Sequence, residues 1–574
     1  MGTYHLYTLI TLHYKKGILK KMTEYNQKNK LFAKRTIIIM YIKIVIFTIL
    51  ISRFFYLQIV TTKKYKFLSI KNKIRIIKIT PPRGKIFDQN NIKLVFNSNK
   101  YVLYIKKISR ESFRDIIKKL KTAFTEKFIN YIVKKLQHKK TKQLIINNLT
   151  LKQIRNIKIQ SEIRNFKIVK DLSRIYKFKN FTFHVIGYVV NYFNNILIGQ
   201  NGIEKSYNSF LNGKYGIRKL IINSRGEIIK YLEYIPPCVG NNISLSVDNK
   251  IQKIILNCIK KKVGSISIMN LKTNKIIGIN SSPTIDSNFF TKKINYTIWN
   301  KIKYDQNNPL INRAISSVYN PGSTFKIIIF LSILHYNVNP NELLNCTGSY
   351  NFFGKKYYCH NLKGHGWINI DQALNKSCNI YFYHKSLQIG IEKINKIARI
   401  FGLGKKTGIK LPFENPGLLP TKLWKKNKYK TEWVQGDTLN VSIGQGYIQS
   451  SNIQLLQMIS RVATGKIIKP LITQKLNPAK KSININIQYL RRIRKALYIN
   501  TKINNLIGKT GTSQIVRKEN SNKKRIFKDH SIFVGYTPYY RPKYSIAIII
   551  ENGGWGRITA LPIAINILYK ISSL

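Results

Sequence analysis

One unbroken apolar stretch near the start of the chain predicts the first structural element, at residues 36–60 (TIIIMYIKIVIFTILISRFFYLQIV). About 20 apolar residues in a helix cross a bilayer, and only Lys43 and Arg53 interrupt this run. No small-residue cleavage site of the kind that ends a signal peptide follows it. We therefore expect a retained transmembrane anchor at 36–60.

Charge before this stretch predicts its orientation. Eight Lys and Arg side chains and one acidic residue, Glu24, lie between Lys15 and Arg35. The positive-inside rule then keeps residues 1–35 in the cytoplasm as a basic tail and sends the rest of the chain across the membrane. A start at Met22 instead of Met1 would keep the anchor. We expect a single-pass protein of the inner membrane with its main part in the periplasm.

Beyond the anchor, the hydrophobic pattern divides the chain at Pro236-Pro237. Residues 61–240 alternate short apolar runs with Lys-rich stretches, which indicates mixed strands and helices with no catalytic cluster. The pattern then sharpens into a strand at 242–247, an amphipathic helix at 248–262 and a hairpin at 264–279; a helix near 323–334 and strands at 530–536 and 544–551 follow. Strands at both ends with helices between them predict an α+β domain at 241–574.

Composition changes this picture little. Apolar residues make up 44% of the 574 residues, enough for a buried core. The net charge of +78 first suggests nucleic-acid binding. Lys is spread along the whole chain together with Ile and Asn, which share AT-rich codons, and is not concentrated in one binding stripe. We therefore exclude nucleic acid as the partner, although a basic surface can still attract anionic lipid headgroups.

Three short motifs in the C-terminal segment carry candidate chemistry. They are Ser323-Thr324-Phe325-Lys326 (S-x-x-K), Ser377-Cys378-Asn379 (S-x-N) and Lys509-Thr510-Gly511-Thr512 (K-T-G-T). Each motif alone is weak, but the three in this order are specific for active-site serine enzymes.

The spacing of the first motif has a chemical reason. Residues i and i+3 of a helix share a face, so Ser323 and Lys326 are neighbours. A serine hydroxyl needs a base to take its proton, and Lys326 can act only if burial and a nearby cation, Lys509, lower its pKa. We expect Ser377 and Asn379 to relay protons and hold the substrate amide. Gly511, on an edge strand, would let substrate backbone pair with that strand.

The same motifs resemble those of the penicilloyl-serine transferases. The flanking residues resemble class B penicillin-binding proteins, and within them the penicillin-binding protein 2 group of rod elongation. The resemblance rests on R-G-K-I-F-D at 83–88, N-G-I-E-K at 201–205, P-G-S-T at 321–324, W-V-Q-G-D at 433–437, G-Q-G-Y at 444–447 and E-N-G-G at 551–554. It departs at Asn320, where the family usually has Pro, and at Gln89, where it usually has Arg.

This resemblance implies a fold and a reaction. The fold is an elongated mixed α/β pedestal (dimerisation) domain at 61–240, followed by a penicillin-binding domain with an antiparallel sheet flanked by helices. The reaction is peptidoglycan D,D-transpeptidation during elongation: Ser323 attacks a D-Ala-D-Ala bond, and an amine of a second stem peptide takes the acyl group. Backbone N–H groups of Ser323 and Thr512 hold the oxyanion, Thr510 and Thr512 hold the terminal carboxylate, and β-lactams acylate the same serine.

Other functions share these motifs. A D,D-carboxypeptidase or a β-lactamase uses the same residues, but such enzymes are usually compact and lack an anchor with a long pedestal. A non-catalytic scaffold or β-lactam sensor is disfavoured because the motif residues are intact. The resemblance also implies as partners a membrane-embedded glycosyltransferase and the rod-elongation complex.

Cysteine spacing adds a second candidate site. Cys346, Cys359, His365 and Cys378 lie close together in the sequence and form a Cys₃His set suited to one structural zinc ion. A disulfide or plain buried thiols remain alternatives, and His360 is a rival ligand. The resemblance supports zinc, because relatives carry an Asp/Asp/His/Cys site over this stretch. A metal here would pin the S-x-N loop through Cys378.

Overall fold

The computed structural model describes residues 4–106, 143–146, 149–159, 166–192, 196–223, 227–291, 296–474, 481–501, 505–514 and 528–573, with a few positions between 121 and 130. They form two compact units, Met1–Ile79 with Gly216–Pro236, and Thr80–Tyr215 with Pro237–Leu574. The two units are described in turn.

The first unit begins with the predicted apolar helix. Helix α1 (Tyr4–Phe55) continues through a π-helical turn, η1 (Tyr56–Val60), into α2 (Thr62–Lys73). Lys15–Val60 is long and apolar enough to cross a membrane. The helix is therefore a candidate membrane span, as the apolar stretch predicts.

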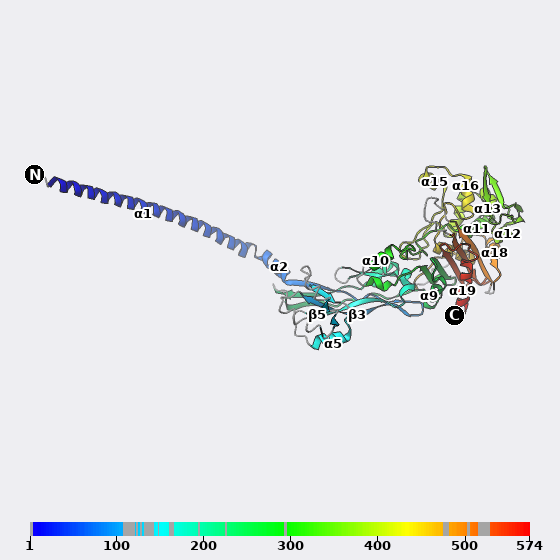
Figure 1. Cartoon of the computed structure of the whole chain (residues 1–574), viewed down its shortest axis with the longest axis horizontal. Coiled ribbons are helices and arrows are strands. Elements are labelled where there is room, and N and C mark those ends of the chain that lie inside the picture. The colour runs from blue at the N-terminus through cyan, green and yellow to red at the C-terminus, as the bar shows by residue number, and fades with distance from the viewer. Residues whose placement is uncertain are drawn as a thin grey trace. The chain divides into compact units, whose positions relative to one another are not determined.

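A small antiparallel sheet completes this unit. Strands β1 (Ile74–Ile79), β8 (Gly216–Ile222) and β9 (Ile228–Ile235) lie in the order β1-β8-β9. Helix α2 contacts both β1 and β8. Because β1 follows α2 directly, the sheet begins one short helix beyond the candidate span (Figure 1).

The second unit opens with the pedestal sheet. Its long strands β3 (Lys93–Lys106) and β5 (Phe166–Tyr176) pair antiparallel over eleven residues. Shorter strands extend it: β2 (Ile86–Phe87), β4 (Gln143–Ile146) and β10 (Ile243–Ser244). The neighbouring elements are α5 (Leu151–Ile159), η2 (Lys179–Thr182), α6 (Phe183–Ile186), β6 (Val189–Tyr192), β7 (Ile196–Gly199), α7 (Gly202–Ser206) and α8 (Asn208–Leu211).

The strand predicted at 242–247 is shorter than expected. It runs in the sheet only at β10, which pairs parallel with β2. The chain then leaves the sheet because Ser246 bonds elsewhere: its N–H donates to the carbonyl of Ile472 and its hydroxyl to the carbonyls of Ile276 and Leu471. These bonds join the end of the pedestal to the catalytic part of the same unit.

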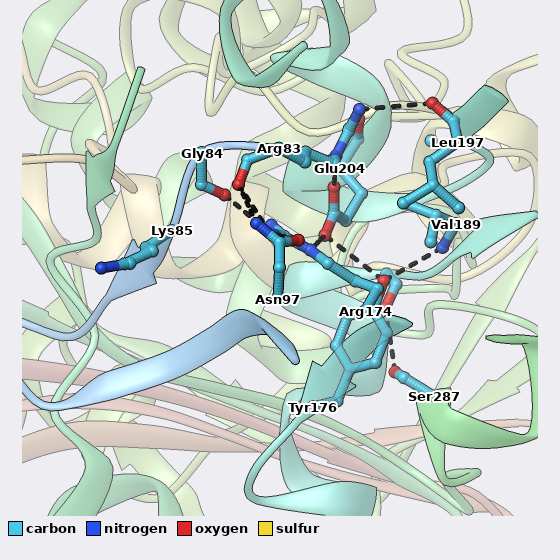
Figure 2. A network of polar contacts seen from close by, with 12 residues as sticks. Arg83, Gly84, Lys85, Asn97, Arg174, Tyr176, Val189, Leu197, Glu204 and Ser287 are labelled. Carbon is cyan, nitrogen blue, oxygen red and sulfur yellow. Dashed lines mark hydrogen bonds and ion pairs between the residues drawn. The ribbon is translucent and has the colours of Figure 1, made fainter. Parts of the chain in front are cut away.

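A buried ionic network holds the pedestal elements together (Figure 2). The carboxylate of Glu204, on α7, accepts from Nε of Arg83 at 2.6 Å and from Nε of Arg174 at 2.9 Å, and all three side chains are almost fully buried. Arg174 also donates to the carbonyl of Gly84 at 2.7 Å. The hydroxyl of Tyr176 lies 3.3 Å from Glu204, and burial, reinforced by that carboxylate, raises the pKa of Tyr176. One carboxylate thus ties the start of the pedestal, β5 and α7 to one another.

The C-terminal part is built on a six-stranded antiparallel sheet in the order β12-β11-β20-β19-β18-β17. The strands are β11 (Gly264–Asn270), β12 (Lys275–Ser282), β17 (Tyr498–Ile499), β18 (Leu506–Ser513), β19 (His530–Thr537) and β20 (Tyr544–Ile550). The hairpin predicted at 264–279 is confirmed as β11 and β12, and the two late strands as β19 and β20.

Strand alternation decides what covers each face of this sheet. Along β20, Ile546 and Ile548 join a core with α9 (Asn249–Ile259) and α19 (Ala560–Ser572), whereas Ala547 and Ile549 join the core that includes α17 (Asn452–Thr464). Both faces of the sheet are therefore buried under helices (Figure 1). The predicted antiparallel sheet flanked by helices is confirmed.

The remaining elements of this unit lie between β12 and β17 in the chain. They are η4 (Ser287–Thr291), α10 (Tyr296–Lys303), η5 (Gly322–Phe325), α11 (Lys326–His335), β13 (Leu344–Cys346), β14 (Ser349–Phe352), β15 (Lys355–Tyr358), β16 (Gly366–Ile368), α12 (Ile370–Asn375), α13 (Asn379–Ile389), α14 (Ile391–Ile400), α15 (Lys422–Tyr429), α16 (Gln435–Ser442) and α18 (Ile487–Ala496).

The ionic network makes a stability prediction. Glu204→Gln removes the charge that compensates two buried guanidinium groups, and breaking a buried pair in this way costs about 3–5 kcal/mol. We expect this decrease in the free energy of unfolding when the full chain is unfolded in urea. Proteolytic cleavage within residues 80–215 monitors the unfolding. The matched control is Glu233→Gln, which breaks an ion pair with Lys219 that is about two-fifths exposed and should cost less than about 1 kcal/mol. Equal effects of the two changes would contradict the role given to Glu204.

Candidate active site

The S-x-x-K motif lies at the start of α11, a helix whose residues 326–334 are all buried. Ser323 sits on the 3₁₀ turn η5 and Lys326 is the first residue of α11. The sequence predicts one α-helix through both residues. The structure differs in that the first turn, which carries Ser323, is a tighter 3₁₀ turn. Residues i and i+3 of a 3₁₀ turn still face the same side. Ser323 is half-buried and Lys326 is fully buried, so the hydroxyl lies nearer to solvent than the amine.

Three oxygens of the S-x-N loop surround the Lys326 ammonium. Nζ donates to the carbonyl of Ser377 at 2.7 Å and to Oδ1 of Asn379 at 2.7 Å, and lies 3.3 Å from Oγ of Ser377. Burial lowers the pKa of Lys326 to about 8. The geometry thus meets both needs of a lysine base: fixed partners and a pKa close to neutrality.

The S-x-N residues form the connection between α12 and α13. Ser377 has φ of +56°, a left-handed conformation that few non-glycine residues adopt. The N–H of Cys378 bonds the carbonyl of Ala373 at 2.8 Å, and the sulfur of Cys378 caps the first turn of α13 by accepting from the N–H of Tyr381. The bend directs the carbonyl of Ser377 toward Lys326.

The K-T-G-T residues lie on β18, which contacts η5. We call η5 the nucleophile turn because it carries the candidate nucleophile Ser323. Strand β17 pairs only with Leu506 and Ile507, so within the described residues 509–512 pair with β19 alone. Lys509 is buried, and burial together with the charge of Lys326 lowers its pKa to about 7. The sequence predicts that burial and the Lys509 charge together lower the pKa of Lys326; burial is the largest cause of the shift at each lysine.

Close backbone packing fixes β18 against the nucleophile turn. A Cβ on Gly511 would lie 2.9 Å from the carbonyl oxygen of Pro321, and a Cβ on Gly322 would lie 2.5 Å from that of Thr512. Gly322 also has φ of +55°. Both this left-handed backbone conformation and the short contact with Thr512 exclude a side chain at this position. Gly511 therefore has a packing role against the nucleophile turn, besides the strand pairing that the sequence suggests.

Gln445 is a positioning residue that the motifs do not assign. Its amide donates to the carbonyl of Thr512 at 2.9 Å, and its carbonyl lies 3.4 Å from the N–H of Gln514. The preceding Gly444 accepts from the N–H of Gly322 at 2.9 Å. Gly444 and Gln445 thus join the nucleophile turn to β18. Only the G-Q-G-Y resemblance pointed to this segment, without a role.

A second set of contacts fixes the chain just before the nucleophile. Glu551, at the end of β20, accepts from the hydroxyl of Tyr319 at 2.6 Å and from Nε of Arg313 at 2.8 Å. Asn320 donates to the carbonyls of Gly446 and Ile448. Asn320 therefore makes side-chain bonds at the position where the family usually has Pro.

The Cys₃His residues predicted from the sequence come together beside the S-x-N loop. One ligand atom each of Cys346, Cys359, His365 and Cys378 lies within 4.8 Å of the others. Nδ1 of His365 is 3.4 Å from the sulfur of Cys346 and 3.6 Å from that of Cys359. Tetrahedral zinc with normal bond lengths needs about 3.6 Å between sulfur and nitrogen ligands, so the set fits this metal.

The pKa values of two thiols in this cluster shift in opposite directions. Hydrogen bonding with Cys378 lowers the pKa of Cys359 and raises that of Cys378, and burial lowers the pKa of His365. Cys359 also accepts from the backbone N–H of Asn379 at 3.4 Å. His360 is exposed, with Nδ1 3.8 Å from the Cys359 sulfur, and lies outside the group of four.

Comparisons with known proteins agree with this geometry. The penicillin binding protein transpeptidase domain matches residues 264–572, and the penicillin-binding protein dimerisation domain matches 78–245. Peptidoglycan D,D-transpeptidase MrdA of Salmonella typhimurium is 29% identical over 95% of this chain and 97% of its own length. The MrdA of Acinetobacter baumannii is 29% identical over 93% of this chain and 87% of its own.

A solved structure shows the same fold. Penicillin-binding protein PBP2 of Helicobacter pylori, in complex with MreC, superposes with a TM-score of 0.75 at 26% identity, over 87% of this chain and 99% of that one. The transpeptidase match alone covers more than half of the chain. With a dimerisation domain ahead of its catalytic domain, the chain belongs to the class B penicillin-binding proteins, the family of peptidoglycan D,D-transpeptidases.

Proposed function

We propose that this chain cross-links peptidoglycan stem peptides through an acyl-enzyme on Ser323, with Lys326 as the general base. The observation that carries the proposal is the buried Lys326 amine, which has three oxygen partners and a pKa of about 8. Neutral Lys326 takes the proton of Ser323 as Oγ attacks the carbonyl carbon of the D-Ala-D-Ala bond. That bond breaks, D-alanine leaves with a proton, and the acyl group remains on Ser323.

The other motif residues complete the step. Backbone N–H groups of Ser323 and Thr512 stabilise the oxyanion. Thr510 and Thr512 bind the terminal carboxylate, Lys509 is the second cation near Lys326, and Gly511 lets the substrate approach β18. Ser377 and Asn379 hold the Lys326 amine and the substrate amide. A side-chain amine of a second stem peptide then attacks the acyl carbon, and Ser323 regains its proton.

We also propose one structural zinc ion at Cys346, Cys359, His365 and Cys378. Three thiolates and one imidazole leave no open position, so the ion would have no catalytic role. Its support is the spacing of the four ligand atoms. Because Cys378 lies between Ser377 and Asn379, and Cys359 bonds the N–H of Asn379, metal binding would hold the two oxygens that surround Lys326.

Location and partners follow from the anchor and the relatives. We propose that residues 36–60 cross the inner membrane, with 1–35 in the cytoplasm, the pedestal at 61–240 and the transpeptidase domain at 241–574 in the periplasm. Basic residues before the span support this orientation. A complex with an MreC-type protein is proposed because the H. pylori relative forms one. A membrane glycosyltransferase and a role in rod elongation are proposed by family resemblance.

The nucleophile can be tested with a fluorescent penicillin. Ser323→Ala should abolish labelling of the full chain, because no acyl-enzyme can form. The matched control is Ser332→Ala on the following helix, α11, whose hydroxyl donates to the carbonyl of Ile328; it should keep its label. Persistent labelling of Ser323→Ala would refute the proposed nucleophile.

The base predicts a pH dependence of acylation. A base with a lowered pKa is mostly protonated, and inactive, below that pKa and becomes neutral above it. The acylation rate by penicillin should therefore rise nearly tenfold per pH unit below about 8 and level off above it. Lys326→Arg, which stays protonated, should be inactive throughout. A rate independent of pH between about 6 and 9 would rule out this base.

Elemental analysis tests the metal. We expect about one zinc per chain, as a closed structural site requires, and its loss in a Cys359→Ala, Cys378→Ala variant. Cys258→Ala removes a thiol outside the cluster and should leave the zinc content unchanged. Zinc retained by the double variant would disprove the site.

A further inference from the structure

The small sheet of the first unit exposes an apolar surface. All eight residues of β9 are exposed, and Tyr231, Tyr234 and Ile228 are 63%, 57% and 50% accessible. Edge strands of soluble proteins are usually protected by charges, bulges or cover. Here six of the eight β9 residues are apolar or aromatic, so the strand needs a cover.

Strand register separates the two faces of this sheet. Arg218 is paired with Ile77 and Tyr234, and Leu220 with Arg75 and Tyr231. Directly paired residues share a face, and the Arg218 guanidinium does lie over the Tyr234 ring, 5.2 Å from its centroid. We call this set the aromatic face. The opposite face carries Ile76 and the Lys219–Glu233 ion pair.

The charge of the neighbouring residues and their distance from the membrane span indicate what covers the exposed surface of β9. Residues 61–79 contain seven Lys and Arg residues and no acidic residue. Helix α2 buries none of its side chains, and its exposed residues include Tyr65 and Phe67. Twelve helical residues span about 18 Å, so β1 starts within that distance of the end of the span.

We propose that the aromatic face, together with α2, lies on the headgroup region of the bilayer that holds α1 and binds anionic phospholipid there. Tyrosine and arginine are suited to this region because each combines an apolar body with a polar tip. Each cation near an anionic surface contributes about 1 kcal/mol. Because α1 and α2 hold the sheet close to the bilayer, the effective concentration of lipid at the aromatic face is high, which favours lipid over a soluble partner. The inference rests on the anchor in the proposed function.

Photo-cross-linking of the full chain in nanodiscs containing phosphatidylglycerol tests this contact. Tyr234→p-benzoylphenylalanine should give a lipid adduct, detected by its mass. The matched control is Ile76→p-benzoylphenylalanine, which is similarly exposed at 57% but lies on the opposite face; its adduct should be several-fold weaker. Arg75→Gln with Arg218→Gln, or phosphatidylcholine alone, should weaken the Tyr234 adduct several-fold.

Three results would overturn the inference. Equal lipid adducts at Tyr234 and Ile76 would mean that the face is not oriented toward the bilayer. Cross-linking of Tyr234 to a protein alone, in native membranes, would assign the face to a protein partner. Failure of the chain to enter nanodiscs would refute the anchor itself, and this result is distinguishable because it precedes any cross-linking.

Discussion

The candidate active site depends on one constraint, the burial of the Lys326 ammonium among oxygens of the S-x-N loop. A buried ammonium is costly unless its hydrogen bonds are satisfied, and here the backbone carbonyl of Ser377 and the amide of Asn379 supply them at 2.7 Å. The same burial lowers the pKa toward the range that a general base needs. Stability and reactivity of the site thus share one cause, and both depend on where the loop is held.

Several elements hold that loop in place. The left-handed Ser377 directs its carbonyl inward, Cys378 caps α13, and Cys359 accepts from the N–H of Asn379. The cysteine cluster is therefore connected to Lys326 through the backbone of two residues. On the other side, Gly322 and Gly511 allow β18 to approach the nucleophile turn at backbone distance. Each contact restricts the backbone of a segment that carries one of the three motifs and so keeps the motifs close together.

The pedestal also buries charged groups, and there the carboxylate of Glu204 compensates them. Glu204 is fully buried between two guanidinium groups, and Asn208, Asn97 and backbone carbonyls accept from Nη1 and Nη2 of Arg83 and from Nη1 of Arg174. Nη2 of Arg174 is buried without a hydrogen-bond partner among the described residues. A buried charge is retained when it is paired and most of its donors are bonded. The basic and aromatic sheet next to α2 is the opposite case, since all eight residues of its strand β9 are exposed, although Leu220 on β8 is buried.

The sequence by itself determined the local features. Apolar length predicts the candidate span, short apolar runs between polar turns predict β11, β12, β19 and β20, and the i, i+3 spacing predicts that Ser323 and Lys326 share a face. These depend on neighbours along the chain, so the pattern is sufficient. Tertiary structure alone decided that Gln445 bonds Thr512 and that Glu204 meets Arg83 across 121 positions. The sequence predicts the four metal ligands, and the fold brings one atom of each within 4.8 Å of the others. Such contacts join distant segments whose approach depends on the packing of the whole core, which no local pattern records.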